Sequence, residues 1–255
     1  MQIATTPDTY ANIRAEATAS SAIVGRLTDG ERVEVESHLN DWTQILTEQG
    51  VRGWVFPQVT FTSIDKVEPD KNKEPIPLSF PVAPDKPVGA GGWPDDWYDA
   101  NHYGHYYEVG TLKAFHTGAD LNRPKDADNN NPIYAVAPST VLWAGKYPAW
   151  GNLVVLKLRG YAPDGICYRV RYGHMRKLNV KRGDNLERGD LIGTVGDADG
   201  RYSPHLHFDL SPTNILDTNP AFWPGLNLKR LKAEFVDPLQ TILQNGGLTI
   251  TQTAL

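Results

Sequence analysis

The chain of 255 residues is long enough for one large domain or two modest ones, and its 40% apolar and 22% charged residues are typical of a folded globular protein. The formal net charge of −5 argues against nucleic acid as the main partner, because binding to phosphates requires a basic surface. No run of about 18 apolar residues occurs, so we expect no membrane span.

The first ten residues, MQIATTPDTY, lack the basic stretch and the apolar stretch of a signal peptide. An exported protein with this sequence would leave the cell by another route or carry a further N-terminal segment. Cys167 is the single cysteine, so no internal disulfide is expected. Its surroundings, GICYRVRY, predict that it is a small buried apolar residue.

Residues 8–62 make up the first predicted unit. Short runs that alternate apolar and polar residues are separated by turn signals such as Asp29-Gly30. The runs are residues 24–27, 32–36, 42–46 and 53–56. Many short strands joined by tight turns predict a small β-barrel or sandwich.

Residues 63–91 differ from both neighbours in composition. They hold six prolines and many charged residues, with weak periodicity. This composition predicts a semi-extended linker.

Residues 92–245 make up the second predicted unit, an antiparallel sheet with little helix. Strands are predicted at residues 133–141, 152–157, 168–172, 190–195 and 205–210. Two Arg-Gly-Asp turns in VKRGDNLERGDLIGTVGD predict a hairpin-like repeat. One short helix is expected from Pro238, with Asp237 as N-cap and Gly246 as the stop. The aromatic stretch 93–110 either lines a binding groove or packs across a sheet.

Three histidine motifs carry the chemistry of the second unit. FHTGAD contains His116 and Asp120, YGHM contains His174, and SPHLHFDL contains His205 and His207. Residues i and i+2 of a strand share a face, so the last two imidazoles are expected side by side.

A turn at Gly118 would fold Asp120 back beside His116. A catalytic zinc takes three protein ligands and a water, so these two residues and one imidazole of the His-x-His strand would complete a site. The remaining imidazoles suit proton transfer and oxyanion stabilisation, since they titrate near neutral pH. The other histidines, His38, His102 and His105, are expected to be structural or solvent-facing.

HTGADL, RYGHM and SPHLHFDL, in this order, resemble the LytM/lysostaphin-type zinc metallopeptidases over roughly residues 110–240. WGNLVVLKL and the stretch ending in IGTVG also resemble this family. The resemblance implies a Zn²⁺-dependent endopeptidase that hydrolyses peptide bonds in bacterial peptidoglycan, outside the cytoplasm or in the cell envelope. The ligands it implies are His116, Asp120 and His207, and the non-ligand catalytic pair it implies is His174 and His205.

The sequence departs from the family pattern at two places. Tyr202-Ser203 stands where a small residue and glycine are usual, and the aromatic stretch lacks the usual Phe-Gly-x-Arg. Tyr106 and Tyr107 are the candidates for an oxyanion partner. Asp209 and Asn122 could hydrogen-bond to the metal ligands and orient them. The alternative for Asp209 is a solvated residue beside the site.

Residues 8–62 resemble a bacterial SH3-like domain through NIRAEATASSAIVGRLTDG, DWTQI and GVRGWV. This resemblance implies a module that binds cell wall or peptide, and the alternative is a spacer. For the whole chain, the alternatives to an endopeptidase are a non-catalytic wall-binding or hydrolase-activating module and another zinc peptidase or amidase. The five motif residues are all present, and no Glu-x-x-His motif accompanies them, which favours the endopeptidase.

Overall fold

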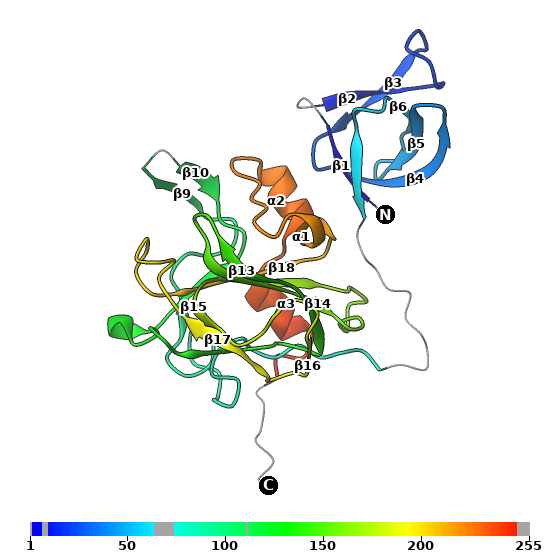
Figure 1. Ribbon diagram of the computed structural model, residues 1–255. Helices are drawn as coiled ribbons and strands as arrows, with labels where there is room; N and C mark the ends of the chain where they lie inside the picture. The colour runs from blue at the N-terminus through cyan, green and yellow to red at the C-terminus, as the bar shows by residue number, and fades with distance from the viewer. Residues whose placement is uncertain (1, 7–9, 64–73, 111, 249–255) are drawn as a thin grey trace. The chain divides into compact units, whose positions relative to one another are not determined.

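The computed structural model describes residues 2–6, 10–63, 74–110 and 112–248, and the chain divides into two compact units (Figure 1). Unit 1 comprises Met1–Ile64 and Pro224–Glu234, and unit 2 comprises Asp65–Trp223 and Phe235–Leu255. Most of the regular structure is antiparallel sheet, so the predicted mostly β fold is confirmed. No helix among the described residues is long and apolar enough to cross a membrane.

Unit 1 is a seven-stranded antiparallel sheet in the order β3-β2-β6-β5-β4-β1-β7. Its elements are β1 (Gln2–Thr5), β2 (Tyr10–Arg14), β3 (Ile23–Thr28), β4 (Arg32–Leu39), β5 (Trp42–Thr47), β6 (Arg52–Val55), β7 (Thr60–Ser63) and α2 (Leu228–Glu234). Alternating residues of these strands, among them Ile13, Leu27 and Ile45, form one apolar core. The period-2 pattern of the sequence therefore predicts which face is buried.

Helix α2 was not expected from the sequence. It packs against β1 through Ala233 and Ile3, and Lys229 forms an ion pair of 3.4 Å with Glu31. A segment far along the chain thus completes unit 1, and local periodicity gives no sign of this.

Unit 2 contains a nine-stranded antiparallel sheet, whose main path runs β16-β13-β14-β15-β18-β11-β8. Its elements are β8 (Tyr98–Asp99), β9 (Tyr106–Val109), β10 (Leu112–Phe115), β11 (Ala119–Asn122), η1 (Pro124–Asp126), β12 (Pro132–Tyr134), β13 (Ser139–Tyr147), β14 (Gly151–Leu158), β15 (Arg169–Leu178), β16 (Asn185–Leu186), β17 (Leu191–Val195), β18 (Leu206–Ser211), α1 (Ile215–Thr218) and α3 (Pro238–Gln244). β9 and β10 pair only with each other, and β12 pairs with β17.

Two local predictions are confirmed in unit 2. Helix α3 begins at Pro238, and the Asp237 side chain accepts a hydrogen bond from the Gln240 backbone N–H. Cys167 is buried and its thiol lies 3.3 Å from the carbonyl oxygen of Leu158.

Two predictions about unit 2 need correction. The predicted linker 63–91 is not solvated throughout, because Leu78, Phe80 and Val82 are fully buried in the core of unit 2. Residues 64–73 of that prediction lie outside the described residues. The Arg-Gly-Asp repeat is not a hairpin: β16 pairs with β13, whereas β17 pairs with β12 and β15. Long-range pairing in the sheet overrides the local turn signal here.

Candidate metal centre and active site

Two neighbouring strands of unit 2 bring His116, Asp120 and His207 together. Asp120 on β11 lies directly opposite His207 on β18 in the antiparallel register. His116 precedes β11. The turn at Gly118 lets the side chains of His116 and Asp120 face the same space. A Cβ atom at Gly118 would lie 2.2 Å from the carbonyl oxygen of Phe208, so only glycine fits there.

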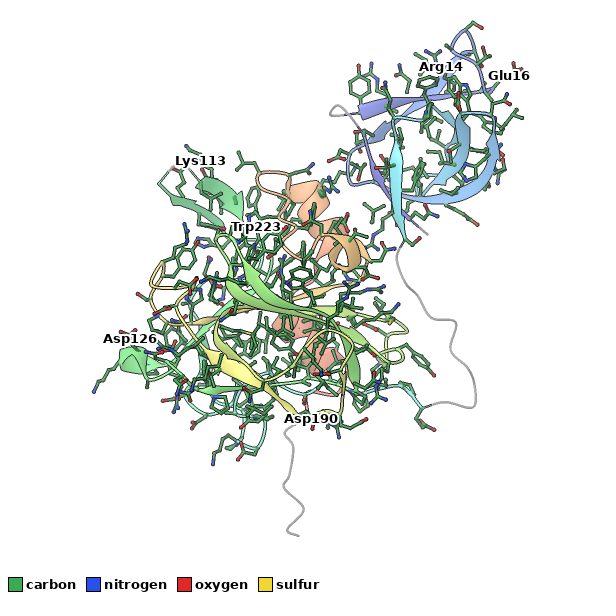
Figure 2. The ribbon with its side chains drawn as sticks, in the orientation of Figure 1. Arg14, Glu16, Lys113, Asp126, Asp190 and Trp223 are labelled. Carbon is green, nitrogen blue, oxygen red and sulfur yellow. The ribbon has the colours of Figure 1, made fainter. Side chains whose placement is uncertain are left out.

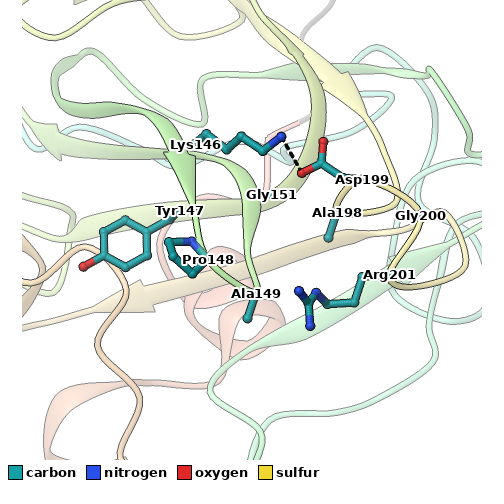
Figure 3. A pocket seen from close by; sticks show the side chains of 9 residues that line it. All are labelled: Lys146, Tyr147, Pro148, Ala149, Gly151, Ala198, Asp199, Gly200 and Arg201. Atoms are coloured by element: carbon teal, nitrogen blue, oxygen red, sulfur yellow. Dashed lines mark ion pairs between the residues drawn. The ribbon is translucent and has the colours of Figure 1, made fainter.

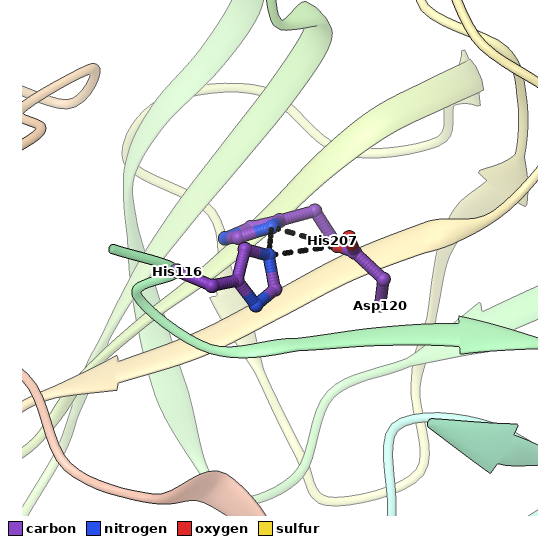
Figure 4. Close-up of side chains that lie close together, drawn as sticks. All are labelled: His116, Asp120 and His207. Atoms are coloured by element: carbon purple, nitrogen blue, oxygen red, sulfur yellow. Dashed lines mark hydrogen bonds and ion pairs between the residues drawn. The ribbon is translucent and has the colours of Figure 1, made fainter. Parts of the chain in front are cut away.

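The three side chains present one donor atom each to a common point (Figure 4). The His116 Nε2 atom lies 3.0 Å from the His207 Nδ1 atom and 3.0 Å from the Asp120 Oδ1 atom. The separation between His207 Nδ1 and Asp120 Oδ1 is also 3.0 Å. His116 and His207 are each only 2% exposed, so this cluster is held inside the protein.

The far side of His207 is fixed by a buried carboxylate. Its Nε2–H group donates to Asp209 Oδ2 at 2.9 Å, which leaves the lone pair of Nδ1 facing His116 and Asp120. The Thr117 hydroxyl donates to the same carboxylate oxygen at 2.8 Å. Asp209 is fully buried, so the hypothesis of a solvated neighbour is wrong for this residue.

A buried arginine compensates the charge of Asp209. Arg171 on β15 is fully buried and donates to Asp209 Oδ2 from Nε at 3.1 Å and also from Nη2. Its Nη1 group donates to the backbone carbonyls of Pro220 at 3.1 Å and Phe222 at 2.8 Å. An unpaired buried charge would be costly, so this pair and its hydrogen bonds must form together.

These contacts change the pKa values of the cluster in a consistent way. Burial tends to raise the pKa of Asp209, but Arg171 and His207 outweigh it and hold that pKa below its ordinary value. Burial also tends to raise the pKa of Asp120, yet His116 and His207 keep it well below its usual range. Burial alone would lower the pKa of His207, and the carboxylates on its two sides raise it instead. Positive charge is therefore favoured between Asp120 and Asp209.

His174 and His205 lie beside this cluster. The ring centroids of His174 and His205 are 4.7 Å apart, and the Nε2 atom of His205 lies 3.7 Å from Asp120 Oδ1. The Nδ1–H of His174 donates to the carbonyl of Trp150 at 3.1 Å, and that of His205 donates to the carbonyl of Ser203 at 2.8 Å. Both Nε2 atoms thus remain as proton acceptors.

His174 has an unusual backbone conformation. Its φ angle is +61°, a left-handed value that is uncommon for a non-glycine residue and that clusters at functional sites. Its backbone N–H donates to the carbonyl of Trp150 at 3.0 Å, so backbone and ring are tied to the same oxygen. Burial holds the pKa of the His174 imidazole well below its ordinary value, which keeps the ring neutral.

Two tryptophans outside the histidine motifs pack against His116, His174 and His207. The Trp150 ring stacks on His174 at a centroid distance of 5.7 Å and lies 5.1 Å from that of His207. Trp223, labelled in Figure 2, lies 6.0 Å from His116 and 5.6 Å from His207 between ring centroids. Neither tryptophan is part of a histidine motif, so only its position in the fold reveals this role.

Several weaker hypotheses can now be compared with the structure. Tyr107 is half-buried, with its ring centroid 6.0 Å from that of His116, and burial raises its pKa. Tyr106 is exposed and its hydroxyl contacts Glu108 instead. Asn122 bonds the Pro204 carbonyl at 3.2 Å rather than a side chain of the cluster.

One of the three histidines expected to be structural, His105, contacts a residue of the site. The Asn101 side chain donates to Asp120 Oδ2 at 3.1 Å, and His105 bonds the Asn101 side-chain oxygen at 2.7 Å. His102 pairs with Asp99, and His38 contacts Thr43 in unit 1. Asn101 therefore fixes the carboxylate that His116 and His207 approach.

The donor set fits a zinc ion. Tetrahedral zinc with bonds of about 2.0–2.1 Å separates its ligand atoms by about 3.3 Å, close to the 3.0 Å seen for all three pairs. A carboxylate that accepts the second N–H of a ligating histidine is a recurrent feature of zinc sites, and Asp209 supplies it for His207. A carboxylate and two buried imidazoles beside two further imidazoles are typical of a metal-dependent hydrolase.

Comparison with known families identifies the two units. Residues 114–220 match the family described as Peptidase family M23, and residues 9–59 match the family described as Bacterial SH3 domain. The chain therefore contains an M23 peptidase domain and a bacterial SH3 domain, and the resemblances drawn from its motifs are confirmed.

Individual relatives match part of this chain. Peptidoglycan DD-endopeptidase ShyA of Vibrio cholerae is 32% identical over 110 residues, which are 42% of this chain and 23% of that protein. Glycyl-glycine endopeptidase ALE-1 of Staphylococcus capitis is 29% identical over 55% of this chain and 36% of its own length. The chain thus spans less than two thirds of these relatives. The solved catalytic domain of lysostaphin from Staphylococcus simulans is 28% identical, with a TM-score of 0.40, over 53% of this chain and 92% of that chain.

Proposed function

We propose that this protein is a zinc-dependent endopeptidase that hydrolyses peptide bonds in the stem peptides or cross-bridges of bacterial peptidoglycan. One observation carries the proposal: three donor atoms of His116, Asp120 and His207 converge at 3.0 Å beside two further imidazoles. The M23 family match and the likeness to a peptidoglycan DD-endopeptidase and a glycyl-glycine endopeptidase support it.

His116 Nε2, Asp120 Oδ1 and His207 Nδ1 would hold the ion. Bound there, zinc would act as a Lewis acid on the scissile carbonyl and on the attacking water. Asp209 keeps the lone pair of His207 Nδ1 directed at the site, and Asn101 keeps the Asp120 carboxylate in place. The protein itself therefore supplies a preorganised ligand set.

His174 and His205 would move the protons. Each has an Nε2 lone pair directed away from the backbone carbonyl that fixes Nδ1–H, so each is able to accept a proton from the attacking water. The one that has accepted it can return it to the leaving amine. The other would stabilise the negative charge that develops on the carbonyl oxygen only with a proton on Nε2 as well, because only then does it present an N–H donor to that oxygen. The low pKa of buried His174 suits a ring that is neutral before the reaction begins.

The N-terminal unit would direct the enzyme to its substrate. The SH3-like domain predicted at residues 8–62 and the peptidase domain predicted at residues 92–245 contain the family matches. We extend the peptidase domain to the preceding segment that carries Leu78, Phe80 and Val82, and we assign residues 224–234 to the N-terminal unit. A cavity of about 320 Å³ lined by Tyr10, Trp42 and Phe56, among others, offers an aromatic surface for a cell-wall or peptide ligand. Such substrates place the action of the protein outside the cytoplasm or in the cell envelope.

Digestion of purified peptidoglycan tests this proposal. We expect new amino termini by mass spectrometry with zinc, none with a chelator, and none with the His116→Ala variant. The identity of the new termini gives the bond that is cleaved. Fragments that persist undiminished in His116→Ala would contradict the zinc mechanism, and association without cleavage would identify a non-catalytic wall-binding module.

A further inference from the structure

Unit 2 has an open cavity of about 520 Å³ that none of the sequence motifs predicts (Figure 3). It is lined by Lys146, Tyr147, Pro148, Ala149, Gly151, Ala198, Asp199, Gly200 and Arg201. The volume lies in the range of about 300–1,000 Å³ that is usual for small-ligand sites. One wall is the turn between β13 and β14, and the other is the loop that precedes the His-x-His strand.

Both walls continue into the residues that pack on the proposed catalytic histidines. Ala149 is followed by Trp150, whose ring stacks on that of His174. Arg201 is followed by Tyr202, whose ring centroid lies 4.8 Å from that of His174 and 6.0 Å from that of His205. A group held in this cavity would therefore lie next to the reacting bond of the substrate.

The backbone of the cavity is strained at three lining residues. Ala149, Ala198 and Asp199 have left-handed φ angles of +65°, +52° and +62°, which are uncommon for residues other than glycine. A Cβ atom at Gly151 would lie 2.7 Å from the Ala198 Cα atom, so the two walls touch at their base. Clustered strain of this kind is typical of ligand-binding loops, because the surrounding structure must be shaped to maintain it.

The charge of the cavity is opposite to that of the whole chain. Lys146 and Arg201 outnumber the single acid Asp199, whereas the chain carries a net charge of −5. Lys146 is neutralised by Asp199 at 2.9 Å. The Arg201 side chain has no hydrogen bond or ion pair to any described residue, and its guanidinium points across the cavity toward Ala149 (Figure 3).

We propose that this cavity binds a free carboxylate of the peptide substrate, with the Arg201 guanidinium as its partner. The inference rests on the proposed peptidoglycan endopeptidase function and adds a substrate preference to it. A guanidinium presents parallel N–H donors that match the two oxygens of a carboxylate, and an amide at the same place would lose the charge and one acceptor. Arg201 would thus select stem peptides whose carboxylates are not amidated.

Binding of synthetic muropeptide dimers to the full chain tests the inference without relying on cleavage. Three dimers are compared: one with all carboxylates free, one amidated at the glutamyl residue and one amidated at the diaminopimelyl residue. We expect amidation of one of these two carboxylates to weaken binding about tenfold, and Arg201→Gln to remove that difference. Arg201→Lys should restore part of it, and Arg188→Gln, an exposed arginine outside the cavity, should leave it unchanged.

Cleavage of the same dimers separates this inference from the proposed function. In Arg201→Gln, KM for the free-acid dimer should rise about tenfold while kcat stays within about twofold of wild type. Equal binding of all three dimers by the wild-type protein, or an unchanged preference in Arg201→Gln, would overturn the carboxylate site. Selective binding that depends on Arg201, without any cleavage, would support the site and contradict the endopeptidase.

Discussion

The two sides of the histidine cluster in unit 2 are held by different kinds of partner. On one side, His207 is 2% exposed and its ring is fixed by Asp209, which is itself fixed by Arg171. On the other side, His174 and His205 donate from Nδ1–H to backbone carbonyls, the His174 ring also stacks on Trp150, and the His205 side chain is 14% exposed. A charged, buried shell suits a group that must not move, whereas a neutral and more open one suits groups that exchange protons with substrate.

This contrast has a physical origin in the sheet. His207 lies in β18, which pairs with β15 and β11 and is buried along its whole length. His205 lies just before the strand, with a single bridge to Gly196, and His174 occupies the left-handed position of β15. Regular sheet therefore surrounds the proposed zinc ligand His207, whereas irregular backbone carries the proposed catalytic pair His174 and His205.

Loss of a proposed ligand should have the largest effect. His207→Ala or Asp120→Ala removes one of three donors, so we expect bound zinc, measured by elemental analysis, to fall to less than about a tenth of an equivalent. Peptidase activity should fall by more than about a thousandfold. His38→Ala, an exposed histidine of unit 1, is the control and should retain both. Full zinc content in both ligand variants would contradict the assignment.

Loss of a proposed catalytic histidine should separate activity from metal content. His174→Asn keeps a residue that tolerates the +61° φ angle, and we expect kcat to fall about 100- to 10,000-fold while zinc remains bound. His205→Asn should behave in the same way, with His102→Asn as the exposed control. If either variant loses its zinc, the two sides of the cluster do not differ as described.

Removal of the buried charge of Asp209 should have a smaller effect, which is on the affinity for zinc. Asp209→Asn keeps the shape but weakens the acceptor for His207, so we expect zinc to bind about 10- to 100-fold more weakly. The variant also leaves Arg171 without its anion, at a cost on the order of 3 kcal/mol in the free energy of unfolding. Titration with a competing chelator and urea unfolding measure the two effects. Asp41→Asn, exposed in unit 1, should change neither.

The effect of zinc chelation on stability should be the smallest of these effects, and it should be confined to unit 2. Free zinc at about 100 times its Kd stabilises the unit that binds it by about 2.7 kcal/mol, or about 5–10 °C in Tm for a domain of this size. Calorimetry with and without chelator measures this shift. The His207→Ala variant should show none, and a shift in the transition of unit 1 would contradict a site made by unit 2 alone.

Local sequence predicts some features of this structure and misses others. Alternating apolar residues give the strands of unit 1 and the buried face of β18, because the period of 2 belongs to the chain itself. The N-cap at Asp237 is also local, so its residue type suffices, whereas glycine is required at position 118 by the distant Phe208 carbonyl oxygen. The pairing of β16 with β13, the burial of Leu78 and Phe80, and the packing of α2 in unit 1 depend on distant partners.

The sequence by itself determined the mostly β fold and the five residues that carry the proposed chemistry, because imidazole and carboxylate groups in ordered motifs are distinctive wherever they fold. Only the tertiary structure decided what surrounds them: the buried Arg171 behind Asp209, the tryptophans on the imidazole rings and the cavity at Arg201. These features arise where strands far apart in the chain meet. Their energies depend on burial and on charge at short range, and neither can be read from a residue's neighbours in sequence.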